Sequence, residues 1–334
     1  MAERGTAIAG FLERAGWGDA MRRPLAADAS FRRYERLAGP RGRAVLMDAP
    51  PPQENVRPFL KVARHLSGLG YSAPRILAED PTLGLLLLED LGDDTFTRLL
   101  ARGADEAELY CLAIDLLIDL HRRSEASAID LPPYDDERLL PEASLLTDWY
   151  MPAIGKPASP ATREEYLRLW RRVLAMFHGK QATLVLRDYH VDNLMRLPGR
   201  AGVAACGLLD FQDALIGPAA YDLVSLLEDA RRDIAPPLVT AMLERYCAAF
   251  PQMDRQAFMT GYTVLGAQRS AKIVGIFTRL MARDGKPLYL GHIPRVWRLL
   301  DAGLAHPALA ELRAWFDEQL PRGVRTIPAI PVPA

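Results

Sequence analysis

The sequence predicts an α+β fold with two lobes, a small mixed β-sheet lobe followed by a mainly helical lobe. Three observations lead to this prediction. The chain has 334 residues, 49% of them hydrophobic, and exceeds the length at which a single hydrophobic core stops growing. Short apolar runs separated by turn residues dominate the chain up to residue 91. Apolar stripes with a helical period dominate it afterwards. We therefore expect an N-terminal lobe at residues 1–91, a helical C-terminal lobe at 92–320 and a proline-rich tail at 321–334.

The elements expected in the N-terminal lobe follow from hydrophobic periodicity and from glycine and proline positions. Alternation near Phe31, Tyr34 and Leu37 indicates a strand, and the turn at 39–42 leads into a second one. Gly70 ends the helix of this lobe. The expected elements are a helix at 4–15, strands within 24–37 and at 44–47, a helix at 56–69, and strands around Ile76 and at 83–88.

The helical lobe is expected from apolar stripes that recur every three or four residues. Residues 130–141 contain several prolines and aspartates and are expected to form a loop. The segment 254–280 is expected to be helical but interrupted at Gly261, Gly266 and Gly275. The expected helices are at 107–121, 160–177, 218–230, 236–250, 254–280, 294–304 and 308–320.

The composition excludes several classes of protein. Lysine and arginine number 41 against 42 aspartates and glutamates, so no general field attracts nucleic acid or an anionic membrane. Cys111, Cys206 and Cys247 are too few and too far apart for a zinc site or a disulfide framework, and we expect reduced core residues. The N-terminus lacks the pattern of a signal peptide, and no stretch approaches the length of a membrane span. These features predict a cytoplasmic protein without nucleic-acid or membrane partners.

The stretch 183–213 carries the clearest chemical signal. Three short apolar runs, at 184–186, 194–197 and 203–209, have polar residues at their ends. A turn at 198–200 would fold the second run onto the third as a hairpin and return Asp210 towards Asn193. With Asp188 after the first run, two carboxylates and an amide are expected to converge.

This set of side chains suits phosphoryl transfer. One carboxylate, Asp188, can accept the proton of an acceptor hydroxyl, and the oxygens of Asn193 and Asp210 can hold Mg²⁺ on the phosphates of ATP. The order Asp188-x4-Asn193 followed by Asp210-Phe211 is that of a kinase catalytic loop and its metal-binding aspartate. The isolated pair Asp188 and Asn193 is also typical of an Asx-turn loop, but Asp210 at the end of an apolar strand favours the catalytic interpretation.

Several motifs resemble a known family. LRDYHVDN at 186–193, DFQD at 210–213, Gly217-Pro218 and Tyr221-Asp222 resemble the aminoglycoside phosphotransferase branch of the kinase-like superfamily. Three further motifs, ADASFRRY at 27–34, VLMDAPP at 45–51 and LEDLG at 88–92, resemble the anomeric kinases of N-acetylmuramate and N-acetylglucosamine that serve peptidoglycan recycling. The resemblance spans about residues 5–320. It implies a bilobal protein-kinase-like fold, ATP and Mg²⁺ as cofactors, and a sugar 1-phosphate that a downstream nucleotidyltransferase could use.

The resemblance also implies a nucleotide site. The loop that includes Ser30 and Phe31 would cover the nucleotide, and the backbone of Glu89 and Leu91 would meet adenine. Met47 stands near the position where a kinase has its phosphate-binding lysine.

Another cation must replace that lysine if the protein transfers phosphate. Strand alternation could turn either Arg32 or Arg33 inward, and we expect Arg33 to bind the phosphates. The alternative is a pair of solvated arginines on a strand edge. Glu54 could orient the cation or simply be a helix N-terminal charge.

The acceptor residues are less well specified. His190 matches the second histidine of the phosphotransferase loop and either contacts the acceptor or braces the loop. Trp149 either stacks on a sugar ring or belongs to the core. Arg269 and Lys272, three residues apart on an expected helix, either bind the lactyl carboxylate of muramate or form a solvated basic face.

Other functions remain open at this point. An aminoglycoside or a small amino alcohol could be the acceptor. Asp188, His190 and Asp192 alternate as they would along one strand and could form the metal site of a hydrolase, with His178 the other histidine nearby in sequence. Met47 and Leu186, which replaces the usual histidine before the catalytic aspartate, raise the possibility of a nucleotide-binding pseudokinase. The intact set of catalytic residues argues against that.

Overall fold

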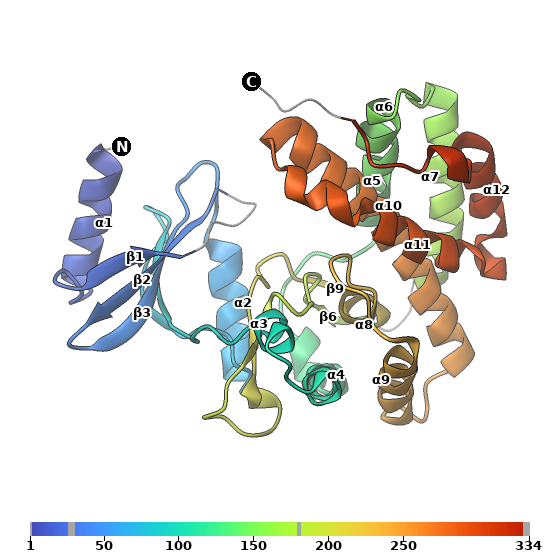
Figure 1. Ribbon diagram of the computed structural model, residues 1–334. Helices are drawn as coiled ribbons and strands as arrows, with labels where there is room; N and C mark the ends of the chain where they lie inside the picture. Colours follow the sequence, from blue (N-terminus) through green and yellow to red (C-terminus); the bar gives the residue numbers. More distant parts are fainter. Residues whose placement is uncertain (1, 26–30, 179–181, 330–334) are drawn as a thin grey trace. The chain divides into compact units, whose positions relative to one another are not determined.

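The computed structural model describes residues 2–25, 31–178 and 182–329 (Figure 1). The chain forms two compact units, each made of two segments. The sheet unit comprises Met1–Ile129 and Val191–Ala214, and the helical unit comprises Asp130–His190 and Leu215–Ala334. The expected α+β class is confirmed, because a β-sheet at the start of the chain is followed by a largely helical region.

The sheet unit contains a five-stranded sheet in the order β1-β2-β3-β5-β4. All of its pairings are antiparallel, so the sheet is not of mixed direction. Gly39 and Gly42 pair at the end of the β2–β3 hairpin, where Gly42 takes a φ of 98° that glycine tolerates best. The strands are β1 (Met21–Pro24), β2 (Arg33–Gly39), β3 (Gly42–Asp48), β4 (Ile76–Asp80) and β5 (Leu85–Glu89).

Helix α1 (Ala2–Arg14) packs on one face of this sheet (Figure 1). Its apolar side chains, with Phe11 at their centre, meet alternate residues of the strands, including Leu37, Leu46 and Leu87. This follows from the two-residue period of a strand, which leaves Val45, Met47 and Leu88 for the opposite face. That opposite face carries the site described below.

Residues 59–72 of the sheet unit contact its later segments through residues far apart in sequence. Tyr71 Oη donates to Asp119 at 2.6 Å, Leu208 N donates to the Ser72 carbonyl at 2.9 Å, and Phe59 stacks on Phe211 with ring centroids 5.0 Å apart. The compact unit therefore continues beyond the boundary expected at residues 91 and 92. Its further elements are α2 (Arg57–Gly68), α3 (Phe96–Ala101), α4 (Glu106–Arg122), and the strands β7 (Leu194–Arg196) and β8 (Cys206–Leu208).

The helical unit is organised around α10 (Arg255–Asp284), a continuous helix of 30 residues. The expected interruptions at its glycines are wrong, because these glycines allow close packing instead of breaking the helix. A Cβ at Gly275 would lie 2.3 Å from the backbone of Leu145, and one at Gly266 would lie 2.7 Å from the Glu228 carboxylate. Tertiary packing therefore outweighs the low helix propensity of glycine at these positions.

One other expectation for this unit needs correction, and part of the expected tail is packed against the unit. Residues 130–141 are not wholly a loop, because Asp135 accepts a bond from Glu137 N at 3.1 Å and starts a helix at Asp136. The tail is packed as far as Thr326, since Tyr150 Oη donates to the Thr326 carbonyl at 2.8 Å and Arg325 pairs with Asp301.

The remaining elements of the helical unit include a small β6–β9 sheet. They are α5 (Asp136–Leu145), α6 (Met151–Ala153), α7 (Pro160–Leu174), β6 (Thr183–Val185), β9 (Leu215–Gly217), α8 (Ala220–Leu227), α9 (Pro236–Ala248), α11 (Ile293–Leu304) and α12 (Ala310–Gln319).

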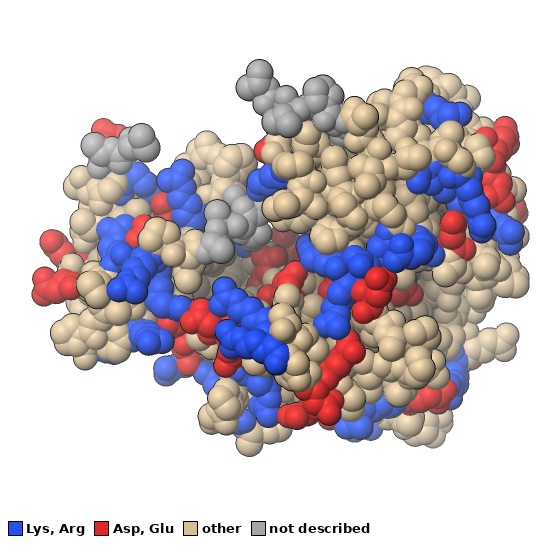
Figure 2. All heavy atoms as spheres, in the orientation of Figure 1, with Lys and Arg blue, Asp and Glu red and all other residues tan. Residues whose placement is uncertain are grey.

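The surface agrees with the balanced composition. Figure 2 shows basic and acidic side chains interspersed over the face that it draws. Within the described part of the chain, none of the helices has the length and apolar character needed to cross a bilayer.

Candidate active site

A pocket of about 350 Å³ lies within the sheet unit, on the face of the sheet opposite α1. Part of its lining is apolar, and part is polar and acidic. The apolar lining includes Leu25, Val45, Met47, Leu88, Leu91, Met195 and Leu209, and the polar lining includes Asn193, Asp210 and Gln212. The size and the division into an apolar and an oxygen-rich part suit a nucleotide with its phosphates.

The β7–β8 hairpin positions the two polar residues expected to bind metal. Leu194 pairs with Leu208, and Leu209 N donates to the Asn193 carbonyl at 2.9 Å, so the hairpin returns Asp210 to the same pocket as Asn193. The predicted hairpin is therefore confirmed. Their oxygens are hard ligands of the kind that Mg²⁺ takes.

The backbone at Asp210 is held in an unusual conformation. Its φ is +56°, a value that costs energy for a residue other than glycine and is often found at functional sites. Two contacts secure it: Gln212 Nε2 donates to Asp210 Oδ1 at 2.8 Å, and buried Phe211 stacks on Phe59. The side chain of Asp210 is thereby aimed into the pocket.

An arginine and a glutamate stand beside Asp210. Arg32 Nη1 lies 3.5 Å from Asp210 Oδ1, and Arg32 Nε lies 3.2 Å from Glu54 Oε2. Burial lowers the pKa of Arg32, but Tyr34, Asp210 and Glu54 more than offset it, so the pKa is raised and the charge is retained. Glu54 therefore contacts a cation rather than serving only as an exposed helix charge.

The structure places Arg32, and not Arg33, at this position. Neither arginine is among the residues that line the pocket, but Arg33 is exposed at the start of β2, whereas Arg32 is largely buried beside Asp210, which does line it. The reason is strand alternation: Tyr34 and Arg36 line the pocket, whereas Leu37 packs on the α1 side. Two residues of the preceding loop were expected to cover the nucleotide. Phe31 is 69% exposed, and Ser30 lies outside the described residues.

Glu89 and Leu91 both line the pocket, at the segment that leaves β5. The Glu89 carboxylate faces other partners, with Oε1 accepting from Arg200 at 2.6 Å and Oε2 lying 3.3 Å from Arg75. Leu91 lies against Gly207, where an added Cβ would come within 3.2 Å of the leucine Cδ1. Any role of Glu89 towards a ligand would therefore use its backbone.

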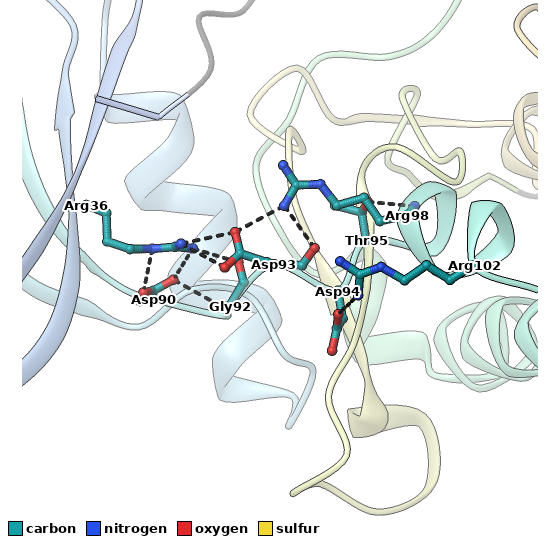
Figure 3. Close-up of polar contacts among 8 residues, drawn as sticks. All are labelled: Arg36, Asp90, Gly92, Asp93, Asp94, Thr95, Arg98 and Arg102. Atoms are coloured by element: carbon teal, nitrogen blue, oxygen red, sulfur yellow. Dashed lines mark hydrogen bonds and ion pairs between the residues drawn. The ribbon is translucent and has the colours of Figure 1, made fainter. Parts of the chain in front are cut away.

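Charged side chains that line the pocket form a network at the segment that follows β5 (Figure 3). Arg36 on β2 reaches Asp90 at 2.8 Å, Asp93 at 2.8 Å and the Gly92 carbonyl at 2.9 Å. Asp93 also accepts from Arg98 of α3 at 3.1 Å. Sequence analysis missed this network, because nothing local shows that Arg36 reaches across from the sheet.

The helical unit holds Asp188 through a buried carboxylate. Asp222 of α8 accepts from Leu186 N at 2.7 Å and from Arg187 N at 2.9 Å. These bonds fix Arg187 at a φ of +67° immediately before Asp188. Burial raises the pKa of Asp222 to about 7, and the two N–H donors lower it. The motif Tyr221-Asp222 was noted in the sequence, but the role of its aspartate was not.

Glu142, also in the helical unit, contacts several polar side chains. Glu142 Oε1 accepts from Lys272 Nζ at 2.8 Å and pairs with Arg187, and Glu142 Oε2 accepts from Tyr134 Oη at 2.6 Å. Burial lowers the pKa of Lys272, but Tyr221 and Glu142 more than offset it and the pKa is raised. Lys272 is therefore a charged interior residue.

Of the two alternatives for Arg269 and Lys272, the solvated basic face on α10 is wrong. Arg269 is 6% exposed and its Nη2 donates to Ser225 Oγ at 3.0 Å, while Lys272 is held by Glu142. His190 is buried, and Trp149 is half-buried in the turn that follows α5. The structure thus brings Lys272 and Arg187 together near Asp188, and it places Arg269 in the packing of α8 and α10.

The hydrolase alternative gains no support. His178 is exposed, and its Nε2 lies 3.2 Å from Asp136 Oδ1. No group of three histidine, cysteine, aspartate or glutamate side chains suited to a metal ion occurs among the residues with a described position.

Comparison with known proteins gives consistent results. Residues 22–256 match the model of the phosphotransferase enzyme family. The chain is 41% identical to an N-acetylmuramate/N-acetylglucosamine kinase of Caulobacter vibrioides, over 96% of this chain and 97% of that one. It is also 41% identical to the protein of the same name from Pseudomonas aeruginosa, over 89% of each.

Solved structures support the fold. A choline/ethanolamine kinase family protein from Mesorhizobium loti superposes with a TM-score of 0.63 at 15% identity, over 93% of this chain and 98% of the other. The ADP-bound aminoglycoside phosphotransferase APH(2'')-Ib superposes with a TM-score of 0.59 at 16% identity, over 93% and 98%. At this identity the likeness concerns the fold, and the expected kinase-like fold is confirmed.

Proposed function

Because the chain belongs to the phosphotransferase enzyme family, we propose that it is an ATP-dependent sugar kinase acting on the anomeric hydroxyl of N-acetylmuramate or N-acetylglucosamine. The observation that carries the proposal is the presence of Asn193 and Asp210 in one pocket of nucleotide size. The acceptor is supported by relatives that are named for both sugars and are 41% identical over most of the chain.

In this proposal the sheet unit binds ATP. Adenine would occupy the apolar part of the pocket and meet the backbone of Glu89 and Leu91. Asn193 and Asp210 would hold Mg²⁺, which when bound offsets phosphate charge and orients the transferred group. Both residues offer oxygen ligands from positions fixed by the β7–β8 hairpin, and they therefore fit such an ion.

Asp188 supplies the base. Its carboxylate would accept the proton of the sugar hydroxyl as that oxygen attacks phosphorus. The bonds from Leu186 N and Arg187 N to Asp222 keep the backbone before Asp188 in place. This arrangement supports a catalytic role, because a base must be held within hydrogen-bond reach of the reacting group.

The acceptor contacts are the least specified part of the proposal. His190 and Trp149 are our candidates for the sugar, as a polar contact and a ring surface. Arg269 and Lys272 already have partners inside the helical unit, so we assign them to positioning rather than to recognition of a lactyl carboxylate. The product, a sugar 1-phosphate, is a substrate for the nucleotidyltransferase class, which we propose acts next.

The test is a transfer assay with the purified chain, ATP and Mg²⁺. N-acetylmuramate, N-acetylglucosamine, an aminoglycoside and ethanolamine are offered separately, and the product is identified by ¹H and ³¹P NMR. We expect a 1-phosphate of one or both sugars. A 6-phosphate would contradict the anomeric assignment, and transfer only to the aminoglycoside or to ethanolamine would contradict the sugar assignment.

A further inference from the structure

Met47 leaves the pocket without the lysine that a kinase places on its third strand. Met47 lies on β3, is 1% exposed and lines the pocket opposite Tyr34. Arg36 and Arg98 also line the pocket, but both are engaged with Asp93 in the segment that follows β5. The acidic part of the lining, where Asp210 lies, needs a positive charge if it is to hold a polyanion.

Arg32 is placed to supply that charge. Its side chain is only 13% exposed, and its guanidinium spans the gap between Glu54 and Asp210. The Arg32–Asp210 separation of 3.5 Å is longer than the 2.7–2.9 Å typical of a strong charge-assisted hydrogen bond. Asp210 can therefore exchange this contact for a metal ion at little cost. The Arg32 guanidinium would then be available to contact the phosphates of the nucleotide.

Glu54 holds both the backbone and the side chain of this segment. Its Oε1 accepts from Phe31 N at 3.1 Å, and its Oε2 lies 3.2 Å from Arg32 Nε. Glu54 N in turn donates to the Pro50 carbonyl at 3.1 Å, just before α2. One carboxylate thus orients two consecutive residues at the edge of the pocket, which reduces the entropy lost when Arg32 engages a ligand.

We propose that Arg32 binds the nucleotide phosphates in place of the lysine absent at Met47, and that Glu54 is its positioning residue. The proposal rests on the proposed function, because it takes the ligand of this pocket to be a nucleotide. Arginine suits the role because its planar fork binds phosphate oxygens in pairs and remains charged. A lysine from β3 and an arginine from the residue just before β2 would reach the same phosphates from neighbouring segments.

The test compares the binding of ADP and of adenosine by calorimetry in the presence of Mg²⁺. Arg32→Ala is expected to weaken ADP binding about 10- to 100-fold, as the loss of a charge-assisted contact should. Adenosine, which has no phosphate, should bind within about twofold of the wild type. Arg32→Lys should be intermediate, and Arg43→Ala, an exposed arginine of β3, is the matched control.

Three results would overturn the proposal. The first is ADP affinity in Arg32→Ala equal to that of the wild type. The second is equal loss of ADP and adenosine, which would mean that Arg32 only maintains the pocket. The third is loss of ADP binding in Arg33→Ala with none in Arg32→Ala, which would return the role to the neighbouring residue.

Two further variants sharpen the test. Glu54→Gln keeps an acceptor for Phe31 N but removes the charge beside Arg32, and it should weaken ADP binding less than Arg32→Ala does. Met47→Lys added to Arg32→Ala should recover part of the lost ADP affinity. If the double variant binds adenosine normally without any recovery towards ADP, the two positions are not equivalent.

The ADP-binding test of Arg32 and the sugar-phosphorylation test of the proposed function can fail independently of each other. A wild-type chain that binds ADP but phosphorylates none of the sugars would contradict the sugar assignment, and the Arg32 variants would still be decided by ADP affinity. A sugar kinase whose Arg32→Ala variant keeps its ADP affinity would contradict the role of Arg32 alone.

Discussion

The two compact units hold their functional residues by different physical means. In the sheet unit, the residues around the pocket are connected by partly exposed ion pairs, such as Arg36 with Asp93. In the helical unit, the backbone before Asp188 is fixed above all by Asp222, whose carboxylate is fully buried. A partly exposed pair stabilises the fold little, whereas a buried group that loses its partners destabilises it considerably. Substitutions in the sheet unit should therefore affect ligand binding, and those in the helical unit should also affect stability.

The largest expected effect separates the two units by function. Asp188→Asn in the helical unit should lower kcat by about 100- to 10,000-fold, because the base is lost. ADP affinity should stay near the wild-type value. Asp210→Ala in the sheet unit should reduce both Mg²⁺-dependent ADP binding and turnover. Steady-state kinetics and calorimetry on the same preparations measure both, and near-normal turnover of Asp188→Asn would show that another group is the base.

The next effect concerns stability. Asp222→Ala should lower the free energy of unfolding by about 3 kcal/mol, because two backbone N–H groups lose their buried acceptor. It should also lower kcat, since Arg187 is no longer held at its positive φ. Urea unfolding measures the first quantity, and Asp222→Asn, which retains one acceptor oxygen, should be intermediate. If Asp222→Ala is as stable as the wild type, the two units do not differ in how much these groups contribute to the free energy of unfolding.

A pH effect is expected from Glu228, a half-buried residue close to Tyr262 and Arg269. Burial raises its pKa from 4.5 to about 7, against the lowering effect of those two residues. The folded state then binds more protons than the unfolded state between these values. Glu228 therefore stabilises the fold fully below pH 4.5, and this contribution is lost as the pH rises through 7, by at most about 3 kcal/mol.

Glu228→Gln tests this contribution. The variant should lose less stability than the wild type between pH 5 and pH 8, as measured by urea unfolding at several pH values. Asp222, whose pKa is also raised to about 7, contributes in the same window and remains in the variant. Parallel pH profiles for the two proteins would mean that Glu228 does not titrate in this range.

The smallest effect is expected in the network of Figure 3. Asp93→Asn weakens the contacts of Arg36 and Arg98, but Arg36 keeps Asp90 and the Gly92 carbonyl. The free energy of unfolding should change by less than about 1 kcal/mol, as for other partly exposed pairs. A loss as large as that of Asp222→Ala would show that the sheet unit also depends on its ion pairs for stability.

The sequence determined the features that depend on neighbours along the chain. The β7–β8 hairpin follows from two apolar runs and a turn, and it brings Asn193 and Asp210 into one pocket as expected. Ser159 caps α7 by accepting from Thr162 N at 3.1 Å, at the start of the helix expected from residue 160. Turn formation and helix capping depend on only a few neighbouring residues, so the local sequence pattern is enough to predict them.

Only the tertiary structure decided which side chains face inward. The choice between Arg32 and Arg33 depends on the phase of β2, which pairing with β3 fixes. The burial of Arg269 and Lys272 depends on which elements pack on α10, and a three-residue spacing is the same for a solvated and a buried face. Glycines within α10 interrupt nothing, because close contacts from elsewhere in the chain offset their low propensity. Each of these outcomes is set by partners distant in sequence, so the local pattern carries no information about them.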